Sequence, residues 1–167
     1  MNLLRWFVIV FLWATIPLAG GFAAADPGAT ISGVLGIELG DGSTAHGDWI
    51  RVLLTTEAVA VPMGDIPSDL PFFVRRDRIN DLHLRFFVNV QKRMGNPGFV
   101  VATTLTTEDG SFRFTEVPPG NYHILVTFPA VIAGVKAAWQ IPVRVAADPD
   151  VAVTLNSENV ALPLAIK

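Results

Sequence analysis

The chain of 167 residues contains no cysteine. Without cysteine there is no disulfide to stabilise an exported domain, and no thiolate to act as a nucleophile or a metal ligand. A bacterial lipoprotein is also excluded, because its anchor is attached to a cysteine just after the cleavage site. The fold of this chain therefore has to be stabilised by packing and hydrogen bonding.

Histidine and tyrosine are scarce as well. The three histidines, His46, His83 and His123, lie far apart in the sequence, and Tyr122 is the one tyrosine. The zinc motif His-Glu-x-x-His and the nucleophile motif Gly-x-Ser-x-Gly do not occur. We therefore predict that the protein is not an enzyme and has no catalytic residues.

Two pairs of side chains offer ligands for a metal ion. His46 lies two residues before Asp48, and Glu108 stands beside Asp109 just before Gly110. Asp is common in turns, because its side chain bonds to the nearby backbone. We therefore expect solvated turns at both places rather than metal sites, and we predict no cofactor.

The longest apolar run stands at the start of the chain. Arg5 is followed by the apolar segment 6–18 and then by the small residues at 23–25 that a signal peptidase recognises. A membrane-spanning helix needs about 20 apolar residues, so this run is too short. We predict a signal peptide at residues 1–25, cleaved before Asp26, with an uncleaved N-terminal anchor as the alternative.

Removal of residues 1–25 leaves 167 − 25 = 142 residues, which suits one domain over 26–167. This part has 12 − 1 = 11 basic and 15 acidic residues, a net charge of 11 − 15 = −4. An acidic chain gives no reason to expect nucleic acid as a partner. Because no second apolar segment is long enough to span a membrane, we predict a periplasmic or secreted protein.

The clearest structural signal lies in the segment 106–126. Asp109-Gly110 predicts a tight hairpin turn, because glycine accepts the positive φ that such turns need. Phe112 and Phe114 alternate with polar residues, which predicts one buried face, and 118–121 predicts a second turn. The segment is therefore expected to form three successive strands joined by turns.

Short apolar segments on both sides extend this pattern. We predict a mainly β, antiparallel sandwich of about seven strands. The other predicted strands are 29–39, 48–62, 99–107, 135–145 and 151–155, with 162–166 as a short last strand and 40–47 as a flexible turn. Gly33 and Gly36 indicate a bulge or a close backbone approach, and Pro142 indicates an edge strand or a bulge.

One region departs from the strand pattern. After the proline-rich linker 62–71, the segment 72–94 contains neither glycine nor proline. Its apolar residues at helical spacing are Ile79, Leu82, Phe86 and Val90. This spacing predicts one helix of about 20 residues. Ser68 or Asp69 is expected to cap its start, and the segment 95–98 is expected to end it.

The segment 106–126 closely resembles the carboxypeptidase regulatory-like domain, and the segment 31–34 matches that family too. The resemblance covers 29–155, apart from the helical region. It implies a prealbumin-like sandwich of seven strands with Greek-key connections, in a family of mostly non-catalytic modules of secreted and envelope proteins. The helical insert at about 62–98, between the second and third strands, departs from the family pattern.

The helical insert is the most specific candidate for a function. Aromatic and arginine side chains dominate protein interfaces, so an exposed helix face would suit an envelope or extracellular protein partner. The predicted docking residues are Phe72, Phe73, Arg75, Arg76, Phe86 and Phe87. In the competing interpretation the helix only covers an open face of the sandwich. A membrane surface is less favoured, because Asp77 and Asp81 interrupt the basic face.

A ligand groove under the helix is a further hypothesis. Trp49, Trp139, Phe99 and Phe128 are the residues expected to line it. Tryptophan in a sandwich is more often part of the core, whereas carbohydrate-binding sandwiches use exposed aromatic platforms. We thus predict an exported, non-catalytic binding or scaffolding module, with a carbohydrate- or small-ligand-binding protein using Trp49 or Trp139 as the alternative.

Overall fold

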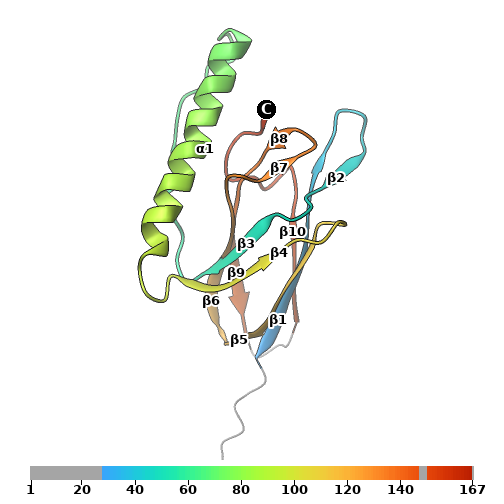
Figure 1. Cartoon of the computed structure of the whole chain (residues 1–167), viewed down its shortest axis with the longest axis vertical. Coiled ribbons are helices and arrows are strands. Elements are labelled where there is room, and N and C mark those ends of the chain that lie inside the picture. The colour runs from blue at the N-terminus through green and yellow to red at the C-terminus, as the bar shows by residue number, and fades with distance from the viewer. Residues whose placement is uncertain (1–27, 147–149, 167) are drawn as a thin grey trace, which may run out of the picture.

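The structure is a computed structural model that describes residues 28–146 and 150–166. Two β-sheets face each other, and one long helix lies against the outer face of the second sheet (Figure 1). The predicted signal peptide at 1–25 lies outside the described residues. No helix in the part of the chain that the structure describes has the length and apolarity needed to cross a membrane.

The first sheet is built around β1 (Ala29–Glu38). β1 lies between β5 (Ser111–Val117) and β10 (Asp150–Leu155), and its last residues also pair with β2 (Thr44–His46). Phe112 and Phe114 of β5 are buried, as predicted, because they face the other sheet. The predicted close approach at Gly33 is confirmed, because a Cβ there would stand 2.4 Å from the Phe112 ring.

The second sheet has the strand order β4-β3-β6-β9. Its strands are β3 (Arg51–Thr55), β4 (Val100–Leu105), β6 (Gly120–Val126) and β9 (Trp139–Val145). Pro142 lies on β9, which is an edge strand as predicted. Three two-residue strands, β7 (Val131–Ile132), β8 (Val135–Lys136) and β11 (Ala165–Ile166), form a small third sheet.

The prediction of a wholly antiparallel sandwich is wrong at one pair of strands. β1 and β10 are parallel, with Ile31 opposite Val151 and Leu35 opposite Leu155. The other strand pairs are antiparallel. Strand direction depends on the path of the whole chain, so the local alternation of apolar residues could not indicate it.

The strand boundaries differ from the prediction in two further ways. The described residues contain eleven strands, of which seven have five residues or more, where about seven were predicted. β2 falls within 40–47, which was predicted as a turn. The predicted strand 48–62 shortens to Arg51–Thr55, because the chain then leaves the sheet to form the linker beside the helix.

Helix α1 (Phe72–Met94) confirms the predicted helix and its end at Gly95. The predicted caps are wrong, because the helix begins at Phe72 and its first flanking residue, Pro71, makes no side-chain capping bond. Proline suits this place, since its fixed φ fits a helix start and it has no N–H to leave unpaired.

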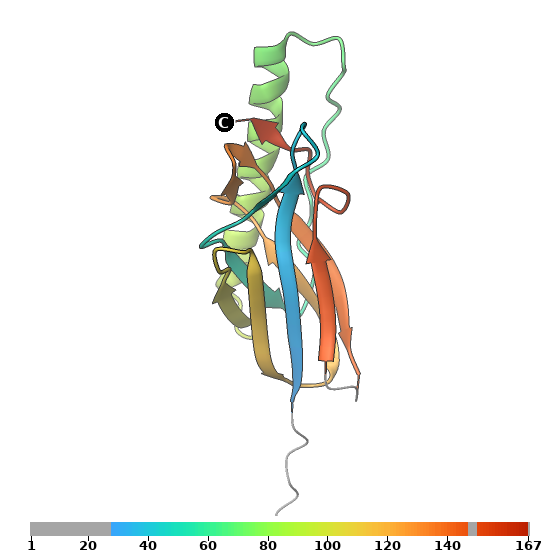
Figure 2. The ribbon, with the colours of Figure 1, turned by 90° about the vertical axis from the view of Figure 1, so that its right-hand side faces the viewer.

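Leu82, Phe86 and Val90 of α1 pack on Leu53 and Leu125, which project from the outer face of the second sheet. This contact makes a second apolar core, separate from the one between the sheets. Figure 2 shows the resulting three layers, with β1, β5 and β10 nearest the viewer and α1 behind. The apolar face of the helix therefore covers part of the sandwich.

Candidate functional site

The predicted docking residues do not form one surface. Phe86 is fully buried against the sheet, so the prediction that it contacts a partner is wrong. Phe72 and Phe73 lie at the start of α1, whereas Phe87 lies 15 residues later, about 22 Å along the helix axis. The arrangement leaves two separate candidate regions at the two ends of the helix.

The first region is the start of α1, which projects past the strands in both ribbon views (Figures 1 and 2). Phe72 and Phe73 are exposed and stack edge to face, with ring centroids 5.5 Å apart. The Arg76 guanidinium lies 5.3 Å from the Phe73 ring centroid and 3.0 Å from Asp77. Phe72, Arg75 and Arg76 line a hollow of about 370 Å³ against the C-terminal segment.

The second region is a hollow of about 440 Å³ between α1, the β3–β4 edge of the sheet and the loop that follows β6; we call it the aromatic groove. Phe87 of α1 stacks edge to face on Phe128 of this loop, with centroids 5.7 Å apart. The residues that line the groove are Trp49, Ile50, Arg51, Leu53, Phe87, Val90, Gln91, Met94, Leu105, Thr127, Phe128, Pro129 and Ala130.

Trp49 is the most exposed aromatic side chain of this groove, with 71% of its surface accessible. Its backbone has φ 54°, a left-handed conformation that costs an L-residue about 1–2 kcal/mol. Thr106 holds the backbone there: its carbonyl accepts from Trp49 N–H at 3.2 Å, and its hydroxyl accepts from Ile50 N–H at 2.8 Å. A large exposed ring in a strained backbone is typical of a functional position.

Polar groups stand among the apolar walls. Arg51 and Gln91 are exposed, and each can donate hydrogen bonds into the groove. The Thr127 hydroxyl oxygen is buried and has no hydrogen-bond partner in the structure. The Lys136 ammonium lies 5.9 Å from the centroid of the Phe128 ring. The groove thus combines aromatic surface with a few hydrogen-bonding groups, as ligand sites do.

Of the residues predicted to line a ligand groove, the structure brings Trp49 and Phe128 together and separates the other two. Trp139 is fully buried between the sheets, and its Nε1 donates to the Asn156 carbonyl at 2.9 Å. Phe99 is buried in the core beneath α1. The prediction of a ligand site at Trp139 is wrong, because its indole faces the core and its polar atom is already bonded.

Arg51, Gln91 and Thr127 were not singled out from the sequence. They are polar residues of ordinary types on three different elements, and only the fold brings them to one groove. Trp49 and Phe128 were singled out from the sequence as groove residues, and Phe87 as a docking residue. Sequence spacing could not reveal that Phe87 and Phe128, 41 residues apart, touch.

Two of the three histidines are at least half-buried. His83 of α1 is buried, and its Nε2 lies 2.8 Å from the Pro163 carbonyl oxygen. His123 on β6 is half-buried, and its Nδ1 has no partner in the structure. Among the described residues, no three His, Asp or Glu side chains gather in a group that could hold a metal ion.

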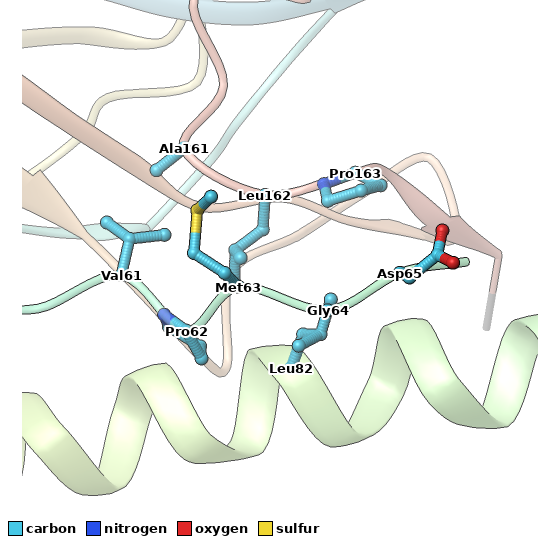
Figure 3. Close-up of a pocket in the computed structure, with 9 residues that line it drawn as sticks. All are labelled: Val61, Pro62, Met63, Gly64, Asp65, Leu82, Ala161, Leu162 and Pro163. Atoms are coloured by element: carbon cyan, nitrogen blue, oxygen red, sulfur yellow. The ribbon is translucent and has the colours of Figure 1, made fainter.

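A further hollow of about 460 Å³ lies between the linker, α1 and the C-terminal segment. Figure 3 shows Met63 of the linker over this hollow, with Leu82 of α1 on one side and Ala161 and Leu162 on the other. Met63 is 93% exposed. Because the linker itself forms one wall and offers few polar groups, this hollow is a less specific candidate than the aromatic groove.

The turn at Asp109 has the chemistry expected of a hairpin. The carboxylate accepts hydrogen bonds from the Thr107 hydroxyl, the Ser111 hydroxyl at 2.9 Å and the Ser111 backbone N–H. These bonds lower the pKa of Asp109 to about 2, because they favour its charged form. Three local hydrogen bonds occupy the acceptor oxygens of this carboxylate, so it serves the turn.

No family model and no curated protein matches this chain. Several solved structures resemble it weakly, and three of them are described here. A proposed carbohydrate-binding protein of Pseudomonas aeruginosa has 15% identity and a TM-score of 0.44, over 80% of this chain and 92% of that one. The major pilin BcpA of Bacillus cereus has 11% identity and a TM-score of 0.41, over 78% of this chain. The major pilin SpaD of Corynebacterium diphtheriae has 10% identity and a TM-score of 0.41, over 77% of this chain.

This chain spans less than a third of either pilin. All three TM-scores lie below 0.5, so they transfer no function to this chain. The aromatic groove therefore has to be interpreted from its own residues.

Proposed function

We propose that this protein is an exported, non-catalytic β-sandwich binding module of the cell envelope, and that the aromatic groove binds a protein partner. The observation that carries the proposal is the meeting of Trp49, Phe87 and Phe128 in one groove beside α1. Exposed aromatic side chains in a hollow are the usual anchors of protein interfaces. Export rests on the predicted signal peptide, and the absence of catalysis on the scattered histidines and missing motifs.

The composition of the groove favours apolar side chains of a polypeptide over a sugar. Ten of the thirteen lining residues are apolar or aromatic, and Met94 adds an adaptable wall. Sugars carry many hydroxyl groups, and each buried hydroxyl needs a hydrogen-bond partner. Arg51, Gln91 and Thr127 supply only a few such partners.

We also propose that the sandwich is of the prealbumin-like Greek-key type found in carboxypeptidase regulatory-like domains, as a single domain over residues 26–167. The strand-turn-strand segment 106–126 supports this, since the turn at Gly110 and the buried Phe112 and Phe114 match the pattern of that family. An experimental structure with a different order of strand connections would contradict it.

A random dodecapeptide phage library and a glycan array, both screened against the purified protein, test the binding proposal. We expect the selected peptides to be rich in apolar residues. Their affinity should fall at least tenfold in the Phe128→Ala variant, because about 1.4 kcal/mol of lost contact is tenfold in Kd. Leu84→Ser is the matched control, since Leu84 is exposed on α1 but does not line the groove.

A second variant separates the two candidate regions. Phe73→Ser removes an exposed ring from the start of α1 and leaves the groove intact. Loss of peptide binding in Phe73→Ser together with normal binding in Phe128→Ala would move the site to the start of the helix and contradict the proposal. A library that selects no peptide would contradict the protein-partner proposal as a whole.

Carbohydrate binding is the second candidate function, and the exposure of Trp49 favours it. A ring that is 71% accessible can stack on the apolar face of a sugar, with Arg51 nearby as a donor. In that case the glycan array should show binding that disappears in the Trp49→Gly variant. Binding to glycans without any selected peptide would favour this candidate over the first.

A further inference from the structure

The strand β4 forms an open edge beside the aromatic groove. In the part of the chain that the structure describes, β4 has a neighbouring strand, β3, on one side only. The opposite edge of the same sheet is protected: β9 carries Pro142, and its Gln140 side chain is bonded to both the N–H and the C=O of Val59. Among the described residues, no proline and no side-chain bond of this kind covers the edge of β4, whose one irregularity is a bulge near its start, where Leu54 faces Ala102 and Thr55 faces Val100.

The hydrogen-bonding groups of β4 can be assigned from the register. Thr106 N–H donates to Ile50 C=O at 2.9 Å, which places these two residues in a hydrogen-bonded pair. Hydrogen-bonded and non-hydrogen-bonded pairs alternate along antiparallel strands. The pairs Leu105–Arg51 and Thr103–Leu53 are therefore the non-hydrogen-bonded ones. In these pairs the N–H and C=O groups of Leu105 and Thr103 point away from β3.

The side chains of β4 leave this edge unprotected. The strand, Val100–Leu105, contains no charged residue, proline or glycine, and Val101 and Leu105 are exposed by 41% and 45%. Natural edge strands are normally blocked by charges, prolines or bulges, because an open edge recruits another strand. The bulge lies at the start of β4, so the regular part of the edge, Ala102–Leu105, stays open beside the groove, as a strand-binding site requires.

Hollows lie on both faces of β4 near Leu105. The aromatic groove lies on the helix side, and a second hollow of about 750 Å³, which we call the strand recess, is lined by Thr104, Thr107 and residues of β1, β5 and β10. Leu105 lines both. Successive side chains of an added strand point to opposite faces of the sheet, so one strand can fill both hollows.

The charges of the two hollows agree with one kind of occupant. Arg51 lines the aromatic groove and Arg113 lines the strand recess, while neither lining contains an Asp or Glu among the described residues. We propose that an extended partner segment, apolar with at least one acidic side chain, adds to the sheet as a strand beside Ala102–Leu105 of β4. This inference rests on the proposed function of the groove.

Amide hydrogen exchange measured by NMR tests the strand, with the dodecapeptides selected from the phage library as probes. In the free protein the amides of Thr103 and Leu105 should exchange rapidly, whereas those of Ala102 and Thr104 should already be protected by β3. Addition of peptide should slow exchange at Thr103 and Leu105 at least tenfold. Unchanged exchange there, while groove signals shift, would overturn strand addition.

The Thr103→Pro variant gives an independent test. Proline removes an outward N–H that β3 does not use, so the fold should survive while strand pairing fails. Peptide affinity should fall at least tenfold, and Thr103→Val should bind normally. If Thr103→Pro bound peptide normally and Phe128→Ala did not, the proposal of strand addition would be wrong. The proposal that the aromatic groove binds peptide would still hold. Normal binding by Phe128→Ala would reject the groove function itself.

A second copy of the chain is the competing occupant of β4. In that case Thr103 and Leu105 amides would become protected as the protein concentration rises, with no peptide present. That result would assign the edge to self-association and overturn the proposal of a partner segment.

Discussion

His83 of helix α1 lies with its Nε2 2.8 Å from the carbonyl oxygen of Pro163, 80 residues later in the chain. The neutral imidazole donates this bond from the buried side of the helix. It ties α1 to the C-terminal segment that leads into β11. Burial is the main cause that lowers the pKa of His83, the Pro163 bond opposes this shift, and the charge of Lys136 adds to it.

The lowered pKa of His83 predicts a pH dependence of stability. In the unfolded chain His83 has its ordinary pKa of 6.5, whereas in the folded protein its pKa is lower. Below pH 6.5 the unfolded state therefore binds a proton at His83 more readily than the folded state does. The free energy of unfolding should therefore be highest above pH 6.5 and should decrease as the pH falls below it. Urea denaturation at pH 7.5 and 5.5 measures this, and His83→Gln should reduce the decrease. If exposed His46, changed to Gln, had the same effect, His83 would not be the cause.

Trp49 should contribute more to binding than to stability. Trp49→Gly relieves the positive φ and removes a ring that buries little surface. Its free energy of unfolding should stay within about 1 kcal/mol of the wild type, while affinity for groove ligands falls. Trp49→Val loses the same ring but places a β-branched residue at φ 54°, and should be less stable by about 1–2 kcal/mol. Equal stability of the two variants in thermal denaturation would show that the positive φ at position 49 does not strain the backbone.

Trp139 should contribute to stability only. Trp139→Phe leaves a gap between the sheets and removes the donor to the Asn156 carbonyl. We expect a loss of about 2–3 kcal/mol in the free energy of unfolding, measured by chemical denaturation. Groove binding by the folded fraction should be unchanged. A stability equal to that of the wild type would show that the indole is not packed as described.

Two glycines with nearly the same positive φ should differ in their tolerance of alanine. Gly110 and Gly134 have φ 76° and 77°. A Cβ on Gly110 would stand 2.2 Å from the Leu35 carbonyl oxygen, whereas nothing lies within 4 Å at Gly134. Gly134→Ala should cost about 1 kcal/mol and Gly110→Ala about 3 kcal/mol or more. Similar melting temperatures for the two variants would contradict the close approach of the hairpin to β1.

The proposed signal peptide predicts the N-terminus of the exported protein. Intact mass and N-terminal sequencing of protein secreted from a bacterial host should give a chain that begins at Asp26. Ala25→Phe should block cleavage, because a signal peptidase needs a small residue at that position. Recovery of the full 167 residues in the membrane fraction would instead favour the uncleaved anchor.

The sequence by itself determined the local elements. Helix Phe72–Met94 and the turn at Gly110 follow from short-range rules, since helical periodicity and positive φ depend on residues within a few positions. The alternation of Phe112 and Phe114 likewise showed which face of β5 is buried. Neighbouring residues suffice for these features.

Only the tertiary structure decided which of these residues work together. Phe86 and Phe87 are adjacent, but each helical residue is rotated by about 100° from the last, so one is buried and the other enters the groove. Trp49 and Trp139 were equivalent in the sequence and ended in solvent and in the core. The groove and the open edge of β4 depend on how distant segments pack across the sheet. Residues that are neighbours in the sequence do not determine that packing.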